Sequence, residues 1–329
     1  MKKIINDTQQ IVDEMLNGFV FANAHLVHRI SDTAVIVRNT AKTGKVGIIS
    51  GGGSGHEPTH AGFVGDGMLS AAVCGEVFTS PTPDQILAAI EASDEGQGVF
   101  MVIKNYSGDV MNFEIAKELA SETGIQVDYV IVDDDISVKD STYTQGRRGV
   151  AGTILVHKIL GYAAKQGKTL AEIKQLADNL VPSIHTIGVA LHAATVPAVG
   201  QPGFELPDDE IEFGVGIHGE PGYRREKLTN SRALADELTS KLVDSFGDYT
   251  GPYAILVNGM GATPLMEQFI FTNDVHTLLT EKQLTAEFVK VGNFMTSIDM
   301  AGLSLTLLKL DKPIYLTALT APVSTSAWG

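Results

Sequence analysis

The sequence has few of the residues that mark secreted or membrane-inserted proteins. Its 329 residues include one cysteine, Cys74, so no disulfide can form within the chain and nothing points to an oxidising compartment. The apolar run at the N-terminus stops after Ile4 and Ile5, well short of the roughly 7–15 residues of a signal peptide. No apolar run approaches the ~20 residues of a membrane span. These absences predict a soluble, cytoplasmic protein.

Positive charge is also scarce. The chain has 24 Lys and Arg against 39 Asp and Glu, which gives a formal net charge of −15. An acidic protein lacks the long-range attraction for phosphate backbones and anionic lipids, so we expect neither nucleic acid nor a membrane as partner. Hydrophobic residues make up 44% of the chain, enough for a folded core. The expected ligand is a small molecule or another protein.

Short β-branched runs alternate with segments of helical periodicity, which is typical of α/β proteins with substantially parallel or mixed sheets. The first half of the chain predicts strands at 34–37, 46–49, 99–103 and 127–132, and helices at 4–20, 83–92, 110–119, 149–165 and 170–180. The second half predicts strands at 184–191, 213–217, 253–257, 288–291, 303–308 and 314–316, and helices at 232–243 and 264–271. Pro182 lies where the two helices 149–165 and 170–180 give way to strands. We therefore predict two α/β domains, 1–181 and 182–329.

A glycine-rich segment, Gly51-Gly52-Gly53-Ser54-Gly55-His56-Glu57-Pro58, directly follows a predicted strand. Glycines at the carboxyl end of a strand let backbone N–H groups approach a ligand, and this edge is where open α/β sheets bind small molecules. A single glycine would indicate only a tight turn, but this cluster favours a site. The segment fits neither the GxxxxGK[ST] nor the GxGxxG pattern, so nucleotide binding by this chain is unsupported.

A second polar segment, Lys104-Asn105-Tyr106-Ser107-Gly108-Asp109, also follows a strand and opens a helix. In a parallel sheet it lies on the same edge as the glycine-rich segment, so Lys104 and Asp109 can converge on His56. An alternative is that Asp109 caps the following helix, which is the usual role of Asp at such a position. Both roles are compatible.

A histidine, His218, stands at the end of the segment Phe213-Gly214-Val215-Gly216-Ile217-His218-Gly219-Glu220. Glycines at 214 and 216 remove side chains from one face of the predicted strand, and Gly219 leaves the imidazole accessible. A lone histidine at a strand end is usually structural. His60 lies four residues after His56, but no nearby Cys and no HExxH pattern support a zinc site, so we predict no metal.

Two charged segments leave alternatives open. Asp133, Asp134 and Asp135 follow a predicted strand and could hold a divalent cation, although a solvated strand end is the simpler interpretation. Arg147 and Arg148 open a helix. They could bind an anionic partner or pair with the three aspartates.

Taken together, these segments resemble the K subunits of bacterial dihydroxyacetone kinases of the phosphotransferase-dependent type, along essentially the whole chain. The collinear motifs that carry the resemblance are GGGSGHEP, GEVFTSPTPDQI, KNYSGDVMNFE, DDD, GRRGVAGT and FGVGIHGEPG. The resemblance implies a two-domain α/β homodimer in which a histidine forms a covalent hemiaminal with the ketone of dihydroxyacetone.

The resemblance also implies roles for particular residues. His218 would be the covalent histidine, with His56 and Asp109 at the hydroxyl that is phosphorylated. The implied substrate-binding residues are Gly53, Ser54, Gly55, His56, Lys104 and Asp109. A neutral imidazole adds to a carbonyl carbon but not to a polyol such as glycerol, so the implied chemistry selects ketones or aldehydes.

The phosphoryl donor is expected to come from other proteins, since no ATP-binding loop is present and the chain ends at Gly329. The resemblance implies an L subunit that carries ADP and Mg²⁺ and is recharged by a phosphotransferase M subunit, with no cofactor on this chain. Some relatives instead sense the ligand and coactivate a transcription regulator, keeping the covalent histidine but losing residues of phosphoryl transfer. Retention of His56, Lys104 and Asp109 favours the kinase subunit.

Overall fold

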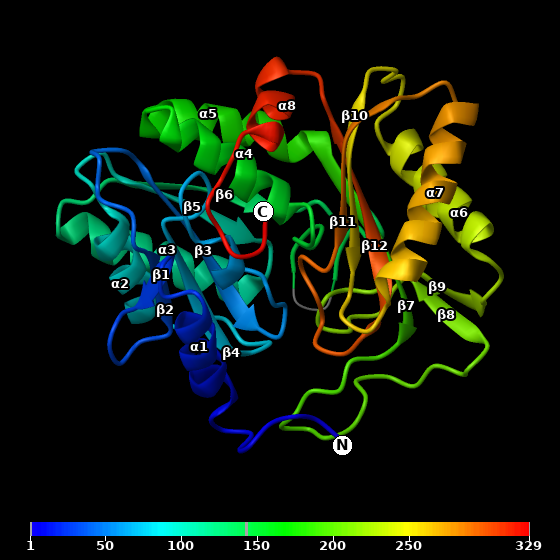
Figure 1. Cartoon of the computed structure of the whole chain (residues 1–329), viewed down its shortest axis with the longest axis horizontal. Coiled ribbons are helices and arrows are strands. Elements are labelled where there is room, and N and C mark those ends of the chain that lie inside the picture. Colours follow the sequence, from blue (N-terminus) through cyan, green and yellow to red (C-terminus); the bar gives the residue numbers. More distant parts are fainter. Residues whose placement is uncertain (1, 142–143, 329) are drawn as a thin grey trace.

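The computed structural model describes residues 2–141 and 144–328. Met1 and Gly329, the outer limits of the two predicted domains, lie outside the described residues. The chain forms two α/β domains, each built on a six-stranded sheet, which lie side by side in Figure 1. The predicted fold class is confirmed. The exact boundary at 181/182 stays a prediction.

The first sheet is largely parallel. Its strand order is β1 (Val27–Arg29), β2 (Val35–Arg38), β4 (Ala71–Val77), β3 (Gly47–Ser54), β5 (Val99–Lys104) and β6 (Val127–Val132). β3 pairs in parallel with both β4 and β5, and β5 pairs in parallel with β6. β1 and β2 are antiparallel additions at one edge. β4 therefore lies on one side of β3 and β5 on the other, and the chain crosses over β3 between them. In parallel sheets a crevice forms at such a position, at the carboxyl end of the central strand.

Helices cover both faces of the first sheet. Helices α2 (Pro83–Ser93) and α3 (Ser107–Glu122) pack on one face, and α1 (Ile11–Ala22), α4 (Thr153–Lys165) and α5 (Leu170–Leu180) pack on the other. In β5, Val99, Met101 and Ile103 face α2 and α3, whereas Phe100 and Val102 face α4. Burial on both faces explains why β5 is continuously apolar.

The second sheet is mostly antiparallel. Its order is β11 (Ala286–Gly292), β10 (Tyr253–Gly259), β12 (Ala301–Lys309), β7 (Ile184–His192), β8 (Glu210–Phe213) and β9 (Arg224–Lys227). β10 and β11 pair in parallel, while the other pairs run antiparallel. Helices α6 (Ser231–Ser245) and α7 (Leu265–Glu281) cover its outer face. The second half therefore does not repeat the parallel pattern of the first.

A helical layer joins the two sheets. In Figure 1, α4 and α8 (Pro313–Thr320) lie between them, and α4 packs against α8. Ala254 and Leu256 of β10 belong to the same buried cluster as α4 and α8, as does Trp328 near the C-terminus. The two domains consequently share part of one core. The described part of the chain also contains two short 3₁₀ helices, Ala61–Phe63 and Val181–Ser183.

Several element predictions were wrong at particular residues. The helix predicted at 149–165 begins at Thr153, and the helix predicted at 264–271 continues to Glu281. The predicted strand 314–316 is part of α8, where Pro313 occupies the first helical position and Tyr315, Ala318 and Leu319 are buried at helical spacing. The predicted strand 213–217 ends at Phe213, because the chain turns at Gly214 with φ +76°. The opening helix begins only at Ile11, and Ile4 is fully exposed.

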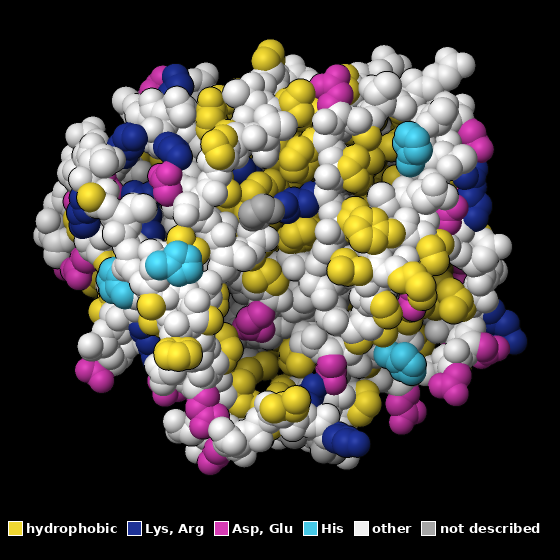
Figure 2. Space-filling view, viewed as in Figure 1, with side chains coloured by type: hydrophobic (Ala, Val, Ile, Leu, Met, Phe, Trp, Pro, Cys, Tyr) yellow, Lys and Arg dark blue, Asp and Glu magenta, His cyan; other side chains and the backbone are white. Residues whose placement is uncertain are grey.

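The surface carries one exposed apolar group on α7. Leu265, Met266, Phe269 and Ile270 are each at least half exposed, and hydrophobic side chains gather over α7 in Figure 2. Within residues 2–141 and 144–328, every helix is too short or too polar to cross a bilayer.

Candidate functional site

A cleft of about 480 Å³ lies at the carboxyl edge of the first sheet, where the second domain meets it. Its wall is formed by the end of β3, the loops after β4, β5 and β8, and the start of α3. The residues that line it are Gly53, Phe78, Ser80, Tyr106, Ser107, Gly108, Asp109 and His218. The carboxyl end of β3, between two parallel neighbours, is where the α/β topology predicts a ligand site.

The glycines of β3 are required by close packing at this edge. A Cβ at Gly53 would lie 2.5 Å from the backbone nitrogen of Thr79 and 2.8 Å from the Cα of Phe78. A Cβ at Gly52 would lie 2.2 Å from Nζ of Lys104. Any side chain at these positions would therefore displace either the Phe78 loop or the Lys104 ammonium group.

Lys104 and Asp109 form a buried ion pair. Their Nζ and Oδ2 atoms are 3.2 Å apart, and the two side chains are 1% and 6% exposed. Asp109 is the third residue of α3, where a negative charge is favoured by the helix dipole. The N-cap residue is Tyr106, so the alternative that Asp109 caps the helix is wrong. Its carboxylate instead balances the charge of Lys104.

His218 lies in the loop after β8 and is held by Glu220. The Nδ1 atom of His218 is 3.0 Å from Oε1 of Glu220, and the backbone N–H of His218 donates to Oε2 at 2.9 Å. The His218 side chain is 18% exposed, whereas that of Glu220 is 1% exposed. Burial opposes ionisation of Glu220, but the hydrogen bond and charge of His218, together with the charge of Arg148, lower its pKa to about 2.

His56 meets His218 from the other domain. Their Nε2 atoms are 3.2 Å apart, and Nδ1 of His56 is 2.7 Å from the carbonyl oxygen of Thr296. Burial, and then the charges of His218 and Lys104, hold the pKa of His56 well below its usual value, so this imidazole is neutral.

Aromatic rings fix the two imidazoles. The ring of Phe78 stacks on that of His56, with centroids 5.1 Å apart, and meets the edge of the His218 ring at 5.0 Å. Tyr106 contacts the His218 ring at 4.6 Å. These contacts restrict both side chains to one orientation at the cleft.

The structure separates the residues expected to bind substrate into two groups. Gly53 and Asp109 line the cleft together with His218, while Lys104 and His56 contact Asp109 and His218 respectively. Ser54 and Gly55 bind protein groups instead. The hydroxyl of Ser54 donates to the Gly75 carbonyl at 2.7 Å, and the Gly55 N–H donates to the Glu57 carboxylate at 3.0 Å.

Four residues without a predicted role contact the two histidines, namely Glu220, Tyr106, Phe78 and Thr296. Glu220 follows His218 by two residues, and this spacing was a usable signal for a carboxylate that orients an imidazole. Phe78 and Tyr106 each follow a strand of the same sheet edge. Thr296 contributes its backbone carbonyl, which no sequence pattern reveals.

The aspartate run is not a solvated strand end. Asp133 is exposed, but Asp134 is buried and accepts hydrogen bonds from the backbone N–H groups of Val150 and Gly152, each at 2.8 Å. Its carboxylate also accepts from the hydroxyl of Thr186, and burial raises its pKa to about 6. Asp134 thereby anchors the turn before α4. Among the described residues there is no group of three or more metal-binding side chains.

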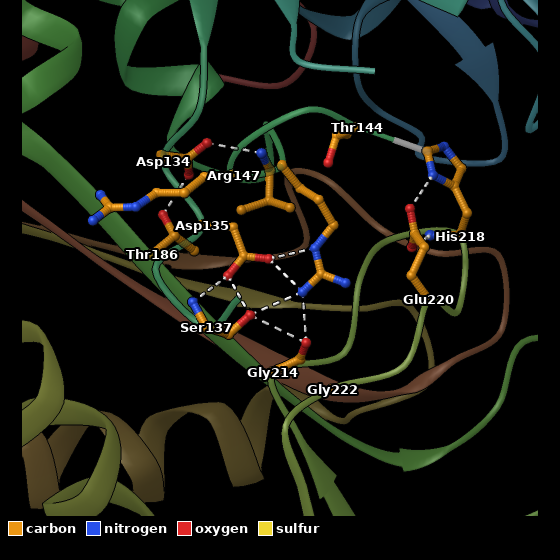
Figure 3. Close-up of polar contacts among 12 residues, drawn as sticks. Asp134, Asp135, Ser137, Thr144, Arg147, Thr186, Gly214, His218, Glu220 and Gly222 are labelled. Atoms are coloured by element: carbon orange, nitrogen blue, oxygen red, sulfur yellow. Dashed lines mark hydrogen bonds and ion pairs between the residues drawn. The ribbon is translucent and has the colours of Figure 1, made fainter. Parts of the chain in front are cut away.

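Asp135 pairs with Arg148, which is one of the alternatives that the sequence left open. The Oδ2 atom of Asp135 is 2.7 Å from Nη2 of Arg148, and both side chains are almost fully buried. Figure 3 shows Asp135, Ser137 and Gly214 on one side of this group of contacts and Glu220 with His218 on the other. Arg147 instead points to His185, with Nη1 3.4 Å from Nε2. The two arginines therefore have different partners.

The fold and cleft define the class of this protein. It is a two-domain α/β protein with a cleft at the domain junction, beside which a partly exposed imidazole, a buried second imidazole and a lysine–aspartate pair lie together.

Comparison with known proteins gives the family. The chain belongs to the Dak1 domain family, whose pattern matches residues 17–327. It is 62% identical over 329 residues to the dihydroxyacetone-binding subunit of the PTS-dependent dihydroxyacetone kinase of Lactococcus lactis, covering 100% of this chain and 99% of that protein.

Two further comparisons involve a regulator. The chain is 46% identical to the coactivator DhaQ of the DhaKLM operon of Lactococcus lactis, covering 99% of this chain and 100% of the coactivator. A solved structure of a dihydroxyacetone kinase operon co-activator matches with a TM-score of 0.91 and 46% identity, covering 96% of this chain and 97% of that one. The same fold thus occurs in kinase subunits and in a coactivator.

Proposed function

We propose that this chain is the dihydroxyacetone-binding subunit of a phosphoenolpyruvate-dependent dihydroxyacetone kinase. In this proposal Nε2 of His218 adds to the ketone carbon and forms a hemiaminal, which presents a substrate hydroxyl for phosphorylation to dihydroxyacetone phosphate. The observation that carries the proposal is that the Glu220-held His218 and the carboxylate of Asp109 face one cleft of suitable size for a triose.

Covalent attachment explains how such a small ligand is selected and held. A carbonyl carbon accepts the imidazole lone pair, whereas glycerol has no electrophilic carbon, so ketones and short aldehydes bind in preference to polyols. The adduct also fixes a flexible triose, which makes phosphoryl transfer an encounter with a prepositioned hydroxyl.

Phosphoryl transfer requires removal of the hydroxyl proton and stabilisation of charge. Asp109 or His56 takes the proton as the substrate oxygen attacks phosphorus, and such general-base help contributes about 10²–10⁴-fold. The Nζ atom of Lys104 lies 3.2 Å from Oδ2 of Asp109 and supplies positive charge beside the cleft. The phosphoryl donor is a separate L subunit that holds ADP and Mg²⁺ and is recharged by an M subunit.

The second candidate function is that of a ligand-sensing coactivator. It is favoured by the similarity to the Lactococcus lactis coactivator, at 46% identity. The kinase subunit of the same organism is 62% identical, and His56, Lys104 and Asp109 are all present in this chain. Both observations support the kinase subunit over the coactivator.

Intact-protein mass spectrometry tests the covalent step. Incubation with dihydroxyacetone should add the mass of one triose to the native chain and none to His218→Ala. His276→Ala, an exposed histidine on α7, is the matched control and should form the adduct normally. An adduct that persists in His218→Ala would place the nucleophile on another residue.

Reconstitution separates the two candidate functions. With L and M subunits, ADP, Mg²⁺ and phosphoenolpyruvate-derived phosphoryl groups, the kinase subunit produces dihydroxyacetone phosphate, whereas a coactivator binds the triose without turnover. The chain alone, mixed with ATP, Mg²⁺ and dihydroxyacetone, should yield no product. Appreciable turnover in that mixture would contradict the division of labour.

We also propose that the chain forms a homodimer, as the resemblance implies. The exposed Leu265, Met266 and Phe269 of α7 form the candidate contact surface, because a second copy of the same helix would remove these side chains from water.

A further inference from the structure

We propose that Glu220, supported by Arg148 and Asp135, is the residue that positions His218 and stabilises the cation formed when His218 adds to a ketone. The inference rests on the proposed function, because it concerns the same histidine. The inference assigns a role to three buried charged side chains, Asp135, Arg148 and Glu220, which extend from the first domain to the loop after β8.

The first step of the argument is the tautomer of His218. Both oxygens of Glu220 bind this one residue, Oε1 at Nδ1 and Oε2 at the backbone N–H, and Figure 3 shows the carboxylate directed at the imidazole. An ionised carboxylate accepts hydrogen bonds and cannot donate them, so Nδ1 must carry a proton. Once Nε2 has lost its proton, the reactive lone pair is therefore on Nε2.

The second step is the proton count between the two imidazoles. Nδ1 of His56 faces the carbonyl oxygen of Thr296, which also only accepts, so this Nδ1 carries a proton as well. Two neutral rings would then face each other with two lone pairs, with their Nε2 atoms 3.2 Å apart. One additional proton, bound to Nε2 of His218 and donated to the lone pair of the neutral His56, satisfies both. The pair accordingly holds a single positive charge, which Glu220 balances.

The third step accounts for the bonds and the proton when His218 adds to the ketone. The Nε2 atom of His218 forms a bond to the carbonyl carbon as the C=O π bond breaks, and the shared proton passes through His56 to the carbonyl oxygen, which becomes a hydroxyl. His56 is left neutral, and the positive charge stays on the substituted imidazole of His218. No further reactant is needed. The positive charge therefore lies on the ring that Glu220 contacts, and this carboxylate balances the charge while it holds Nδ1 in place during bond formation.

The fourth step is the support of Glu220 from the first domain. Arg148 is fully buried, and its Nη2 atom donates to Asp135, Ser137 and the Gly214 carbonyl. Its Nη1 atom has no hydrogen-bond partner within the part of the chain that the structure describes.

Gly216 brings the guanidinium and the carboxylate together. A Cβ at this position would lie 2.8 Å from Nη1 of Arg148 and 2.1 Å from Oε2 of Glu220, so a glycine lets both groups pack against the same backbone. The charge of Arg148 is one cause of the low pKa of Glu220. Asp135, between β6 and α4, in turn fixes Arg148.

The test compares Glu220→Gln with Glu212→Gln. Glu212 is a second buried carboxylate of the same hairpin, bound to the backbone N–H of Gly222 and to Arg225, and it has no contact with His218 in the described residues. Adduct formation is titrated with dihydroxyacetone labelled with ¹³C at the ketone carbon and followed by NMR. The protonation of each imidazole nitrogen is read from ¹⁵N spectra of histidine-labelled protein.

The expected result is specific to Glu220. Glu220→Gln should weaken adduct formation about 10- to 100-fold, the usual effect of removing a charged hydrogen-bond partner, and should release His218 from its single Nδ1–H form. Glu212→Gln should change neither measurement, and Glu220→Asp should restore part of the affinity. Unchanged affinity and an unchanged ¹⁵N signature in Glu220→Gln, or an equal loss in Glu212→Gln, would overturn the inference.

The wild-type protein provides a second measurement that needs no variant. Its ¹⁵N spectrum should show Nδ1 of His218 protonated both before and after the ketone is added. A deprotonated Nδ1 in the free protein would overturn the inference even if Glu220→Gln failed to fold. Absence of any adduct in the wild-type protein would instead refute the proposed function, so the two failures are distinguishable.

Discussion

The Nε2 atoms of His56 and His218 lie 3.2 Å apart although 162 positions separate the two residues in the chain. His56 follows the strand that forms the glycine-rich edge of the first domain, and His218 belongs to the loop after β8 in the second. The contact therefore exists only when the two domains are in place. It also brings a neutral, buried imidazole against a partly exposed one, which is the arrangement needed to move a proton at the cleft.

Asp109→Asn should separate ketone binding from phosphoryl transfer. The adduct on His218 should form with near-normal affinity, because Asp109 does not contact the imidazole pair in the described structure. Transfer in the reconstituted system should slow by about 10²–10⁴-fold, since the amide cannot accept the hydroxyl proton. Asp133→Asn, an exposed neighbour of the buried aspartates, is the control. A transfer rate within threefold of the wild-type rate would exclude Asp109 as the base.

Gly53→Ala should weaken adduct formation through a steric effect. The new Cβ would lie 2.5 Å from a backbone atom of Thr79 and 2.8 Å from one of Phe78, so the Phe78 loop must move. Because the Phe78 ring contacts both imidazoles, we expect adduct affinity to fall about tenfold and the free energy of unfolding to fall by about 1–3 kcal/mol.

Gly18→Ala serves as the control for this substitution. Gly18 lies in α1 with nothing within 4 Å of its Cβ position, and alanine there should be neutral or stabilising by about 0.5–1 kcal/mol. Denaturant titration and the mass-spectrometric adduct assay measure both variants. Equal adduct affinity in Gly53→Ala and the native chain would contradict the proposed packing role.

Acidification below pH 6.5 should destabilise the protein through its buried, neutral histidines. Burial lowers the pKa of His157 from 6.5 to about 3, so below pH 6.5 the unfolded chain binds a proton that the native state excludes. Stability is therefore complete above pH 6.5 and declines as the pH falls towards 3. For His157 alone the loss between pH 7 and pH 5 is about 2 kcal/mol. His56 and His60, whose pKa values are also lowered by burial, add to it.

Urea unfolding at pH 7 and pH 5 checks this dependence. His157→Gln should reduce the stability lost between the two pH values by about 2 kcal/mol, whereas His276→Gln, at an exposed position on α7, should lose as much as the native chain. The same loss in all three proteins would show that His157 does not remain neutral in the native state.

Phe269→Glu should weaken the proposed homodimer. Phe269 is 57% exposed on α7, and a charge placed there would be buried without a partner in a dimer that covers this helix. Sedimentation velocity should show a dimer for the native chain and a substantial monomer fraction for Phe269→Glu. Gln175→Glu, at an exposed position on α5 in the first domain, is the control for an added charge. A native chain that is monomeric at all concentrations would disprove the proposal.

Local sequence was sufficient for much of the first domain. The strands at 99–104 and 127–132 were predicted almost to the residue, because each is a short, mostly apolar run rich in β-branched residues between polar or glycine residues. The glycine-rich edge followed from the same reasoning, since parallel strands present their carboxyl ends together. The second sheet was less predictable. Strand direction depends on which strands pair, and the periodicity of one segment carries no information about its partner.

The sequence alone determined which reactive side chains are present, where glycines allow a ligand or another segment to approach the backbone, and that strands alternate with helices. Only the tertiary structure decided their relationships. In the tertiary structure, Asp109 is the ion-pair partner of Lys104 and not a helix cap, and residues 314–316 are part of α8 and not a strand. Glu220 and Arg148 lie near His218, which no local pattern predicted. The physical reason is that periodicity and capping are local properties. Ion pairs and facing imidazoles arise instead from distant segments that burial of the shared core brings together.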